Sequence, residues 1–216
     1  AKDIKSTIDA SIYRLRKPEN YFLQGISWPL IGINKFSAKL TPYDVINNKA
    51  ANSIHFRNEI DYCLFGYLNS NVYNTLLNML NPTVNYPLVN IANSPYNQIE
   101  NDNVCNIVKD NIEMAKNDWD SFETSWDFKK HPFVSGQCLV GSEEETNHSS
   151  LITNHYNHWK QECEERFNQL KANEEELNRI FIDIYGLHDE LTPEVADKDV
   201  TVHRIFDTKE DVPESM

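Results

Sequence analysis

The chain has few of the features that mark membrane proteins or enzymes. Its apolar runs are short and interrupted, as in "SWPLIGI" and "RIFIDIYG", so none approaches the roughly 20 residues that a membrane helix needs. It has no GxSxG, phosphate-loop, glycine-rich dinucleotide or HExxH motif, and so no recognisable catalytic machinery. The opening "AKDIKSTIDA" lacks an initiator methionine and the basic and apolar regions of a signal peptide. We therefore expect a cytoplasmic protein without membrane contact, compatible with a piece of a longer chain.

Cysteines are also few and widely spaced. Cys63, Cys105, Cys138 and Cys163 form no CxxC pair, so their spacing predicts neither a local zinc knuckle nor a dense disulfide framework. We interpret them as free, mostly structural thiols.

The net charge of −13 is distributed unevenly. Residues 1 to 100 have nine Lys and Arg against seven Asp and Glu, a balance of +2, and the remaining residues have a balance of −15. Because DNA phosphates repel an acidic surface, any nucleic-acid contact is expected in the first half. The second half is expected to be a solvated helical structure or a protein-binding surface.

The first hundred residues predict a small irregular β region followed by a helical hairpin. "GISW" and "KFSAKL" have the aromatic and alternating character of short strands. From Glu59 to Leu80 apolar residues recur at helical spacing in two sets, with Asn69 or Ser70 able to cap the second helix. Pro82 then ends it.

The second half predicts more helices. One runs from about Asn101 to Asp118, and an aromatic connector follows to residue 134. Residues 135–150 predict a flexible loop, residues 151–200 a helical hairpin and residues 201–216 a tail, with partial disorder expected after Pro193. The hairpin rests on a capping box at Asn173 and Glu176 and on helix termination at Gly186. Its buried stripes are Ile152, Tyr156, Trp159, Cys163, Phe167 and Leu170, then Leu177, Ile180, Phe181 and Ile184. The fold class is α+β, mostly helical, with a long antiparallel helix pair.

Three patterns suggest chemistry, and each has a more ordinary explanation. "NSPY" at 93–96 differs by one residue from the Asn-Pro-Pro-Tyr motif that holds a flipped adenine, but no cofactor loop precedes it, so a turn is favoured. His148, His155, His158 and Cys163 lie within sixteen residues but lack the i, i+4 pairing of a helical zinc site, which favours a surface histidine patch beside a buried thiol. The glutamate runs at 143–145 and 174–176 are typical of solvated loops or helix starts. We therefore assign no catalytic, cofactor-binding or metal residue.

A DNA-binding surface is the more specific candidate. "WPLIGINKFSAKL" interleaves aromatic residues with cations and hydroxyls, which can bind phosphates or read base edges. The candidate DNA-binding residues are Trp28, Lys35, Ser37, Lys39 and Arg57. Lysines on a solvated strand are the common alternative.

Three longer stretches together resemble one protein family. "LNSNVYNTLLNMLNPTVNY", "AKNDWDSFETSWDFKKHP" and "NEEELNRIFIDIYGLHDELTPEV" are similar, in this order, to segments of the PglX-type adenine-specific DNA methyltransferases of BREX phage-defence systems and of related type IIG restriction-modification enzymes. The similarity extends roughly from Trp28 to Thr201. The family methylates adenine at N6 with S-adenosylmethionine, and its cofactor loop and catalytic motif lie upstream of the matching region.

The resemblance implies a non-catalytic fragment of such an enzyme, with no cofactor in this chain and S-adenosylmethionine in the parent. Residues 1–100 are expected to form part of a target-recognition domain that binds duplex DNA, and the rest a helical packing unit. Partners would then be DNA, the catalytic domain of the parent chain and defence-system subunits. One alternative is an acidic assembly module, or even a DNA mimic; another is a self-sufficient methyltransferase, which would have to bind S-adenosylmethionine.

Overall fold

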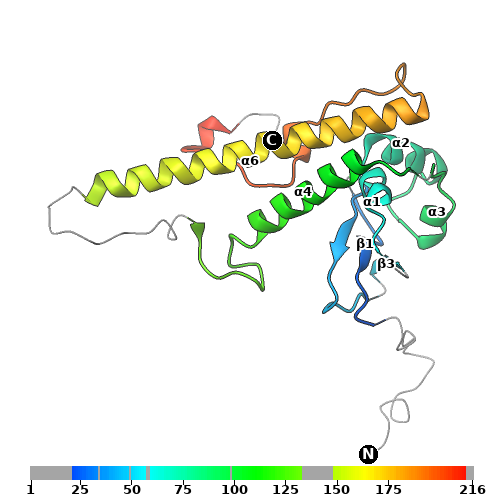
Figure 1. Ribbon diagram of the computed structural model, residues 1–216, viewed down its shortest axis with the longest axis horizontal. Coiled ribbons are helices and arrows are strands. Elements are labelled where there is room, and N and C mark those ends of the chain that lie inside the picture. Colours follow the sequence, from blue (N-terminus) through cyan, green and yellow to red (C-terminus); the bar gives the residue numbers. More distant parts are fainter. Residues whose placement is uncertain are drawn as a thin grey trace, which may run out of the picture. The chain divides into compact units, whose positions relative to one another are not determined.

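The protein is described by a computed structural model that divides the chain into two compact units (Figure 1). The structure describes residues 21–132 and 148–212, apart from 34, 49, 57, 58 and 98, and apart from the side chains of residues 148–152 and 210. Unit 1 comprises Ala1–Asp61 and Leu77–Pro95, and unit 2 comprises Tyr62–Leu76 and Tyr96–Met216. The predicted loop at 135–150 lies outside the described residues up to residue 147.

Unit 1 contains a three-stranded antiparallel sheet of order β2-β1-β3. β1 (Gly25–Pro29) is central and mostly buried, with β2 (Lys39–Thr41) and β3 (Ala51–His55) on its two sides. Ile26 of β1 pairs with Leu40 of β2 and with Ile54 of β3. The first two strands confirm the predicted β region. β3 was not predicted, because "ANSIH" is mostly polar and none of its residues is fully buried.

The core of unit 1 forms around the aromatic side chain of Trp28. Its ring lies 6.0 Å from that of Phe36, and Phe36 makes an edge contact with Tyr86 at 5.2 Å. The backbone carbonyl of Tyr86 accepts hydrogen bonds from the Trp28 indole N–H and the Asn52 amide, both at 3.0 Å. A buried indole N–H needs such an acceptor, so this carbonyl satisfies the polar atom of the largest core residue.

The predicted helices on either side of residues 69 and 70 are present. α1 (Tyr62–Leu68) is followed by α2 (Asn71–Leu80), and the boundary between the two units falls within α2. The Ser70 hydroxyl accepts a hydrogen bond from the Tyr73 N–H at 3.2 Å, which confirms Ser70 as the cap of α2. After α2, a turn held by the Asn81 and Thr83 side chains leads to the short helix α3 (Leu88–Ala92).

The helix expected near Asn101 to Asp118 is also confirmed. α4 (Asp102–Trp119) has Asn101 as its N-cap, whose side chain accepts from the N–H groups of Asn103 and Val104. Val104 and Val108 are buried on the predicted apolar face. The connector that follows consists of turns, which leave Trp126 fully exposed.

The predicted helical hairpin at 151–200 is wrong, because residues 148 to 185 form one continuous helix. α6 (His148–Tyr185) is 38 residues long and passes through Asn173 without a break. The Asn173 side chain does not cap a helix; it donates to Asn111 of α4 and accepts from Gln169 one turn earlier. The stretch around it, "LKANEEELNR", contains strong helix formers and neither glycine nor proline, so nothing local ends the helix there.

The end of α6 is where the sequence placed it. Gly186 has φ of +67°, and the N–H groups of Gly186 and Leu187 donate to the carbonyls of Asp183 and Ile182. This is the Schellman arrangement that a left-handed residue closes. The predicted stripe needs one correction near this end, since Ile182 is buried and Ile184 is exposed.

The long antiparallel helix pair exists, but its members are α4 and α6 (Figure 1). Asn111 bonds to Asn173, and Asp118 near the end of α4 bonds to Arg166 earlier in α6, so the two helices run in opposite directions. The apolar seam of α6 is buried at Cys163, Phe167 and Leu170.

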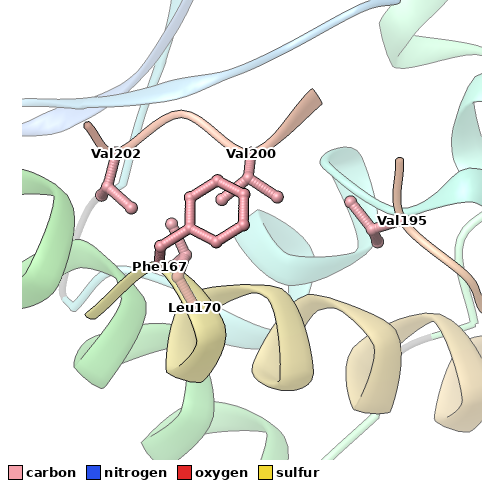
Figure 2. Close-up of a cluster of buried hydrophobic side chains, with 5 residues drawn as sticks. All are labelled: Phe167, Leu170, Val195, Val200 and Val202. Atoms are coloured by element: carbon pink, nitrogen blue, oxygen red, sulfur yellow. The ribbon is translucent and has the colours of Figure 1, made fainter. Parts of the chain in front are cut away.

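The part of the segment after Pro193 that the structure describes, residues 194–212, packs on α6, although partial disorder was expected after Pro193. Val195, Val200 and Val202 pack on Phe167 and Leu170 of α6 (Figure 2). Two short 3-10 helices, η3 (Asp197–Asp199) and η4 (Lys209–Asp211), interrupt the segment. The segment has few valines among mostly polar residues, so its sequence does not predict that it packs on α6. Its position depends on the apolar surface that α6 offers.

Ion pairs along α6 hold the same segment. Arg204 forms a two-bond pair with Glu164, each bond 2.6 Å long, and its guanidinium lies over the Phe167 ring. Lys171 bonds to Asp197 at 2.6 Å, and Lys160 bonds to Asp207 at 2.5 Å. These pairs fix the path of the segment along the helix more than they stabilise it, because partly exposed pairs contribute little.

Asp118 is the buried charged residue at the centre of this arrangement. Its carboxylate is 3% exposed and accepts from Arg166 at 2.8 Å and from the His203 backbone N–H at 3.0 Å. The His203 Nδ1 atom lies 2.6 Å from the same carboxylate. The side chain therefore joins α4, α6 and the C-terminal segment.

Asn178 of α6 makes a comparable connection with an uncharged side chain. It is buried, accepts from the Asn71 N–H at 2.8 Å and donates to the Pro193 carbonyl at 3.0 Å. It thereby joins the start of α2 and the chain beyond α6.

α1 and α4 cross closely at Gly66. A Cβ atom at this position would lie 2.8 Å from Cγ2 of Val108. Next to the glycine, the buried Tyr67 ring stacks on Tyr185 of α6 with centroids 5.3 Å apart and contacts Phe181 at 5.6 Å. Burial raises the pKa of the Tyr67 hydroxyl, and a hydrogen bond to Tyr185 adds to the shift.

No helix in the described part of the chain is both long and apolar enough to cross a membrane.

We expect Gly66→Ala to lower the free energy of unfolding by about 1 to 2 kcal/mol, because the new methyl group overpacks the crossing with Val108. Without that contact, alanine would stabilise the helix by up to about 1 kcal/mol. The same change in a Val108→Ala background should therefore be neutral or stabilising. Urea unfolding of the four proteins measures the difference, and an equal effect of Gly66→Ala in both backgrounds contradicts the crossing.

We expect Asp118→Asn to lower the free energy of unfolding by about 3 kcal/mol, because Arg166 and His203 lose a buried anionic partner. Asp183→Asn is the matched control. Its carboxylate is 49% exposed and lies 3.6 Å from Arg179, so its loss should change stability by less than about 0.5 kcal/mol. Urea denaturation measures the free energy of unfolding of both variants. Similar losses of stability in the two would contradict the role given to Asp118.

Candidate nucleic-acid interface

Three of the predicted DNA-binding residues lie together on the surface of unit 1. Lys35, Ser37 and Lys39 are exposed in the segment that leads into and begins β2. Phe36 between them is 3% exposed and packs on Trp28 and Tyr86. The buried ring holds its neighbours at the surface, just before the edge strand β2.

Trp28 is not part of this surface, which corrects its place among the candidates. The side chain is 1% exposed, and its indole N–H is used by the Tyr86 carbonyl. A ring in this position cannot stack on a base or contact a phosphate. Arg57, the fifth candidate, lies outside the described residues.

The structure adds a feature of unit 1 that the sequence analysis missed. Many large apolar side chains are exposed on it, and Ile33, two residues before Lys35, is 93% exposed. The Ile31 backbone pairs with Asn85, and the Gly32 N–H donates to the Val84 carbonyl, so the exposed Ile31 and Val84 lie on adjacent segments. The exposed apolar residues of unit 1 are Phe22, Ile31, Ile33, Tyr43, Val45, Ile46, Met79, Leu80, Val84, Leu88 and Val89. Large exposed apolar surface commonly marks a protein contact.

The end of α4 and the connector that follows it have a second group of exposed aromatic and basic residues, in unit 2. Trp119 and Trp126 are exposed, and Lys129 and Lys130 line a shallow hollow. The hollow also contains Lys116, whose ammonium bonds to Asp120 and, at 2.9 Å, to Asp127. The bond to Asp120 raises the pKa of Lys116, and the bond to Lys116 lowers the pKa of Asp120. Because carboxylates already balance the cation, the hollow is a weaker anion site than its lysines suggest.

The tetrapeptide "NSPY" forms a turn after a helix. Asn93 ends α3 with its N–H bonded to the Val89 carbonyl, and the Ser94 hydroxyl donates to the Asn90 carbonyl at 2.9 Å. The Tyr96 ring lies 5.4 Å from the buried Tyr67 ring. Asn93 therefore follows a helix instead of a strand, and the half-buried Tyr96 ring packs on Tyr67, in agreement with the turn interpretation.

The histidine and glutamate patterns of α6 have structural partners. His158 Nε2 lies 3.2 Å from Glu162, and Cys163 is buried. Within the described ranges, no group of three or more potential metal ligands occurs. The glutamates at 174–176 lie inside α6. They therefore do not mark the start of a helix, although the sequence pattern had suggested one. Glu176 pairs with Arg179, and Glu175 accepts from the Val195 N–H.

In comparisons with known proteins, no protein-family model matches the chain, and two similar proteins are found. The chain is 37% identical over 209 residues to the adenine-specific methyltransferase PglX of Lacticaseibacillus casei (strain Zhang), covering 93% of this chain and 17% of that protein. It is 24% identical over 181 residues to the adenine-specific methyltransferase BrxX of Escherichia coli O9:H4 (strain HS), covering 82% of this chain and 14% of that protein. The chain therefore spans about a sixth of the length of these curated relatives, and it is homologous to a segment of the PglX- and BrxX-type adenine-specific methyltransferases.

Proposed function

We propose that the chain is a non-catalytic segment of an adenine-specific DNA methyltransferase and that it contributes DNA target recognition and helical packing. The observation that carries the proposal is the collinear similarity to two such enzymes over nearly the whole chain but a small part of each enzyme. The parent would use S-adenosylmethionine to methylate adenine at N6, with the cofactor and catalytic motifs in another part of the enzyme. The proposed setting is a BREX-type phage-defence system.

In this proposal the DNA contact is the exposed segment of unit 1 that contains Lys35, Ser37 and Lys39. Two ammonium groups and a hydroxyl, in the segment that leads into the edge strand β2 and at its first residue, can bind successive backbone phosphates. Such contacts orient a protein on the duplex without reading sequence, and base reading would need further residues. The small number of cations suits a module that binds DNA weakly alone and more strongly as part of the enzyme.

A second candidate function is an assembly module, and the exposed apolar residues of unit 1 favour it. Side chains such as Ile33 and Val89 are unfavourable in water and would be covered by the catalytic part of the parent chain. In unit 2, the acidic surface would contact defence-system subunits. The two functions are compatible, since an enzyme segment can both bind DNA and pack on its neighbour.

We expect the chain to bind a mixed-sequence duplex weakly and to lose most of its affinity between about 50 and 200 mM salt. Lys35→Gln combined with Lys39→Gln should weaken binding about threefold to tenfold and reduce the slope of log affinity against log salt by about 1 to 2. Fluorescence anisotropy with a labelled duplex measures both quantities.

The matched control is Lys198→Gln combined with Lys209→Gln, which removes two exposed lysines from unit 2. It changes the net charge by the same amount and should leave binding unchanged. If both pairs have the same effect, the contact is nonspecific. If the Lys35 and Lys39 changes alter the DNA affinity of neither this chain nor the full enzyme, the recognition role is wrong and the assembly role remains.

We expect isothermal titration calorimetry to detect no binding of S-adenosylmethionine to this chain. The reason is that "NSPY" forms a turn whose tyrosine ring packs on Tyr67 and that the sequence has no glycine-rich cofactor loop. Heat of binding with a stoichiometry near one would contradict the proposal and favour a self-sufficient methyltransferase.

A further inference from the structure

The structure brings two cysteine thiols into contact although they are 42 positions apart. Cys63 lies in α1 and Cys105 in the first turns of α4, and their Sγ atoms are 3.1 Å apart. A disulfide has a sulfur separation of about 2.05 Å, so the two atoms need to approach by only about 1 Å. Widely spaced cysteines gave no reason to expect such a pair.

The surrounding structure holds this geometry in place. The close crossing at Gly66, one turn after Cys63, fixes the separation of α1 and α4. The carbonyl of Asn101, the cap of α4, accepts from the Cys105 N–H at 3.0 Å and faces the Cys63 thiol at 3.7 Å. Both cysteines are therefore attached to backbone that cannot readily separate.

The two thiols differ in access to solvent. Cys105 is partly exposed, whereas Cys63 is 2% exposed. An oxidant in solution would reach Cys105 first, and the buried Cys63 would then be the nearest nucleophile. Cys163 provides a contrast, because it is 1% exposed, burial raises its pKa, and no other described cysteine contacts it.

We propose that Cys63 and Cys105 form a modification site at which hydrogen peroxide produces an intramolecular disulfide. The Cys105 thiolate attacks one peroxide oxygen, the O–O bond breaks, and a sulfenic acid forms with release of water after proton uptake. The Cys63 thiolate then attacks the sulfenic sulfur, the S–S bond forms, and the hydroxyl group leaves as a second water. In total, two thiols lose two electrons and two protons, and one peroxide is reduced to two waters.

The bond would join α1 to α4 covalently. It closes the chain between residues 63 and 105, which restricts the unfolded state and should raise the midpoint of thermal unfolding by at least about 5 °C. The expected change is in stability and thiol reactivity within unit 2.

The test treats the whole chain with hydrogen peroxide, blocks the remaining thiols with iodoacetamide, and analyses a non-reducing digest by mass spectrometry. We expect a linked pair of peptides containing Cys63 and Cys105, two hydrogens lighter than their sum and separated by dithiothreitol. Loss of the Cys105 thiol should be at least about tenfold faster than loss of the Cys163 thiol. The experiment uses the unmodified chain, so it does not depend on the folding of a variant.

Variants then assign the site. Cys105→Ser should abolish both the linked peptides and the rise in the unfolding midpoint, while Cys163→Ser should retain both. Two results would overturn the proposal. One is accumulation of Cys105 sulfinic acid beside an unmodified Cys63, and the other is a dominant link that contains Cys138.

Discussion

The buried carboxylate of Asp118 is the constraint on which the arrangement of unit 2 depends. A charge that is 3% exposed must be matched by hydrogen bonds and an opposite charge, and Arg166 and the backbone and ring of His203 provide them. These partners come from two segments, one 48 and one 85 positions away. α4, α6 and the C-terminal segment therefore have to lie together before the charge is accommodated. Asn178 repeats the principle without charge, where α6 meets the start of α2 and the Pro193 backbone.

α6 is the element that makes these connections possible. Most of the stability of a helix in a protein comes from the packing of its apolar face, so the seam of this 38-residue helix has to be covered. α4 covers one part of it, α1 contributes Tyr67 near its end, and Val195, Val200 and Val202 cover Phe167 and Leu170. Its acidic residues are less available than their number suggests, because several are used as partners of Arg179, Arg204 and the Val195 N–H. This matters for an assembly role, which would have to use the remaining acidic surface.

Several residues within the three stretches on which the resemblance to the methyltransferases rests build these connections. Ser70 caps α2, Asn81 and Thr83 hold a turn, Asp118 and Asn178 join segments, and Gly186 ends α6. Their roles are in packing and chain reversal, which agrees with a segment that supports chemistry performed elsewhere. In unit 1, the proposed partners could contact the exposed segment with Lys35, Ser37 and Lys39 and the exposed apolar residues. In unit 2, they could contact the aromatic connector after α4.

The sequence by itself determined the local elements, because their causes lie within a few residues. Asn101 and Ser70 cap helices with their own side chains, Gly186 adopts the left-handed conformation that ends α6, and the apolar periodicity identifies α4. Within the candidate site, Lys35, Ser37 and Lys39 are exposed around the buried Phe36, and their contact with DNA stays a prediction.

Only the tertiary structure decided the rest. Asn173 could have capped a helix, but the continuous helix lets it bond to α4, and the aromatic composition that suggested a base contact for Trp28 serves the core. β3 and the ordered C-terminal segment gain their stability from β1 and from α6, and the Cys63–Cys105 contact requires the crossing at Gly66. In each case the deciding partner is far away in the chain, where local propensity carries no information.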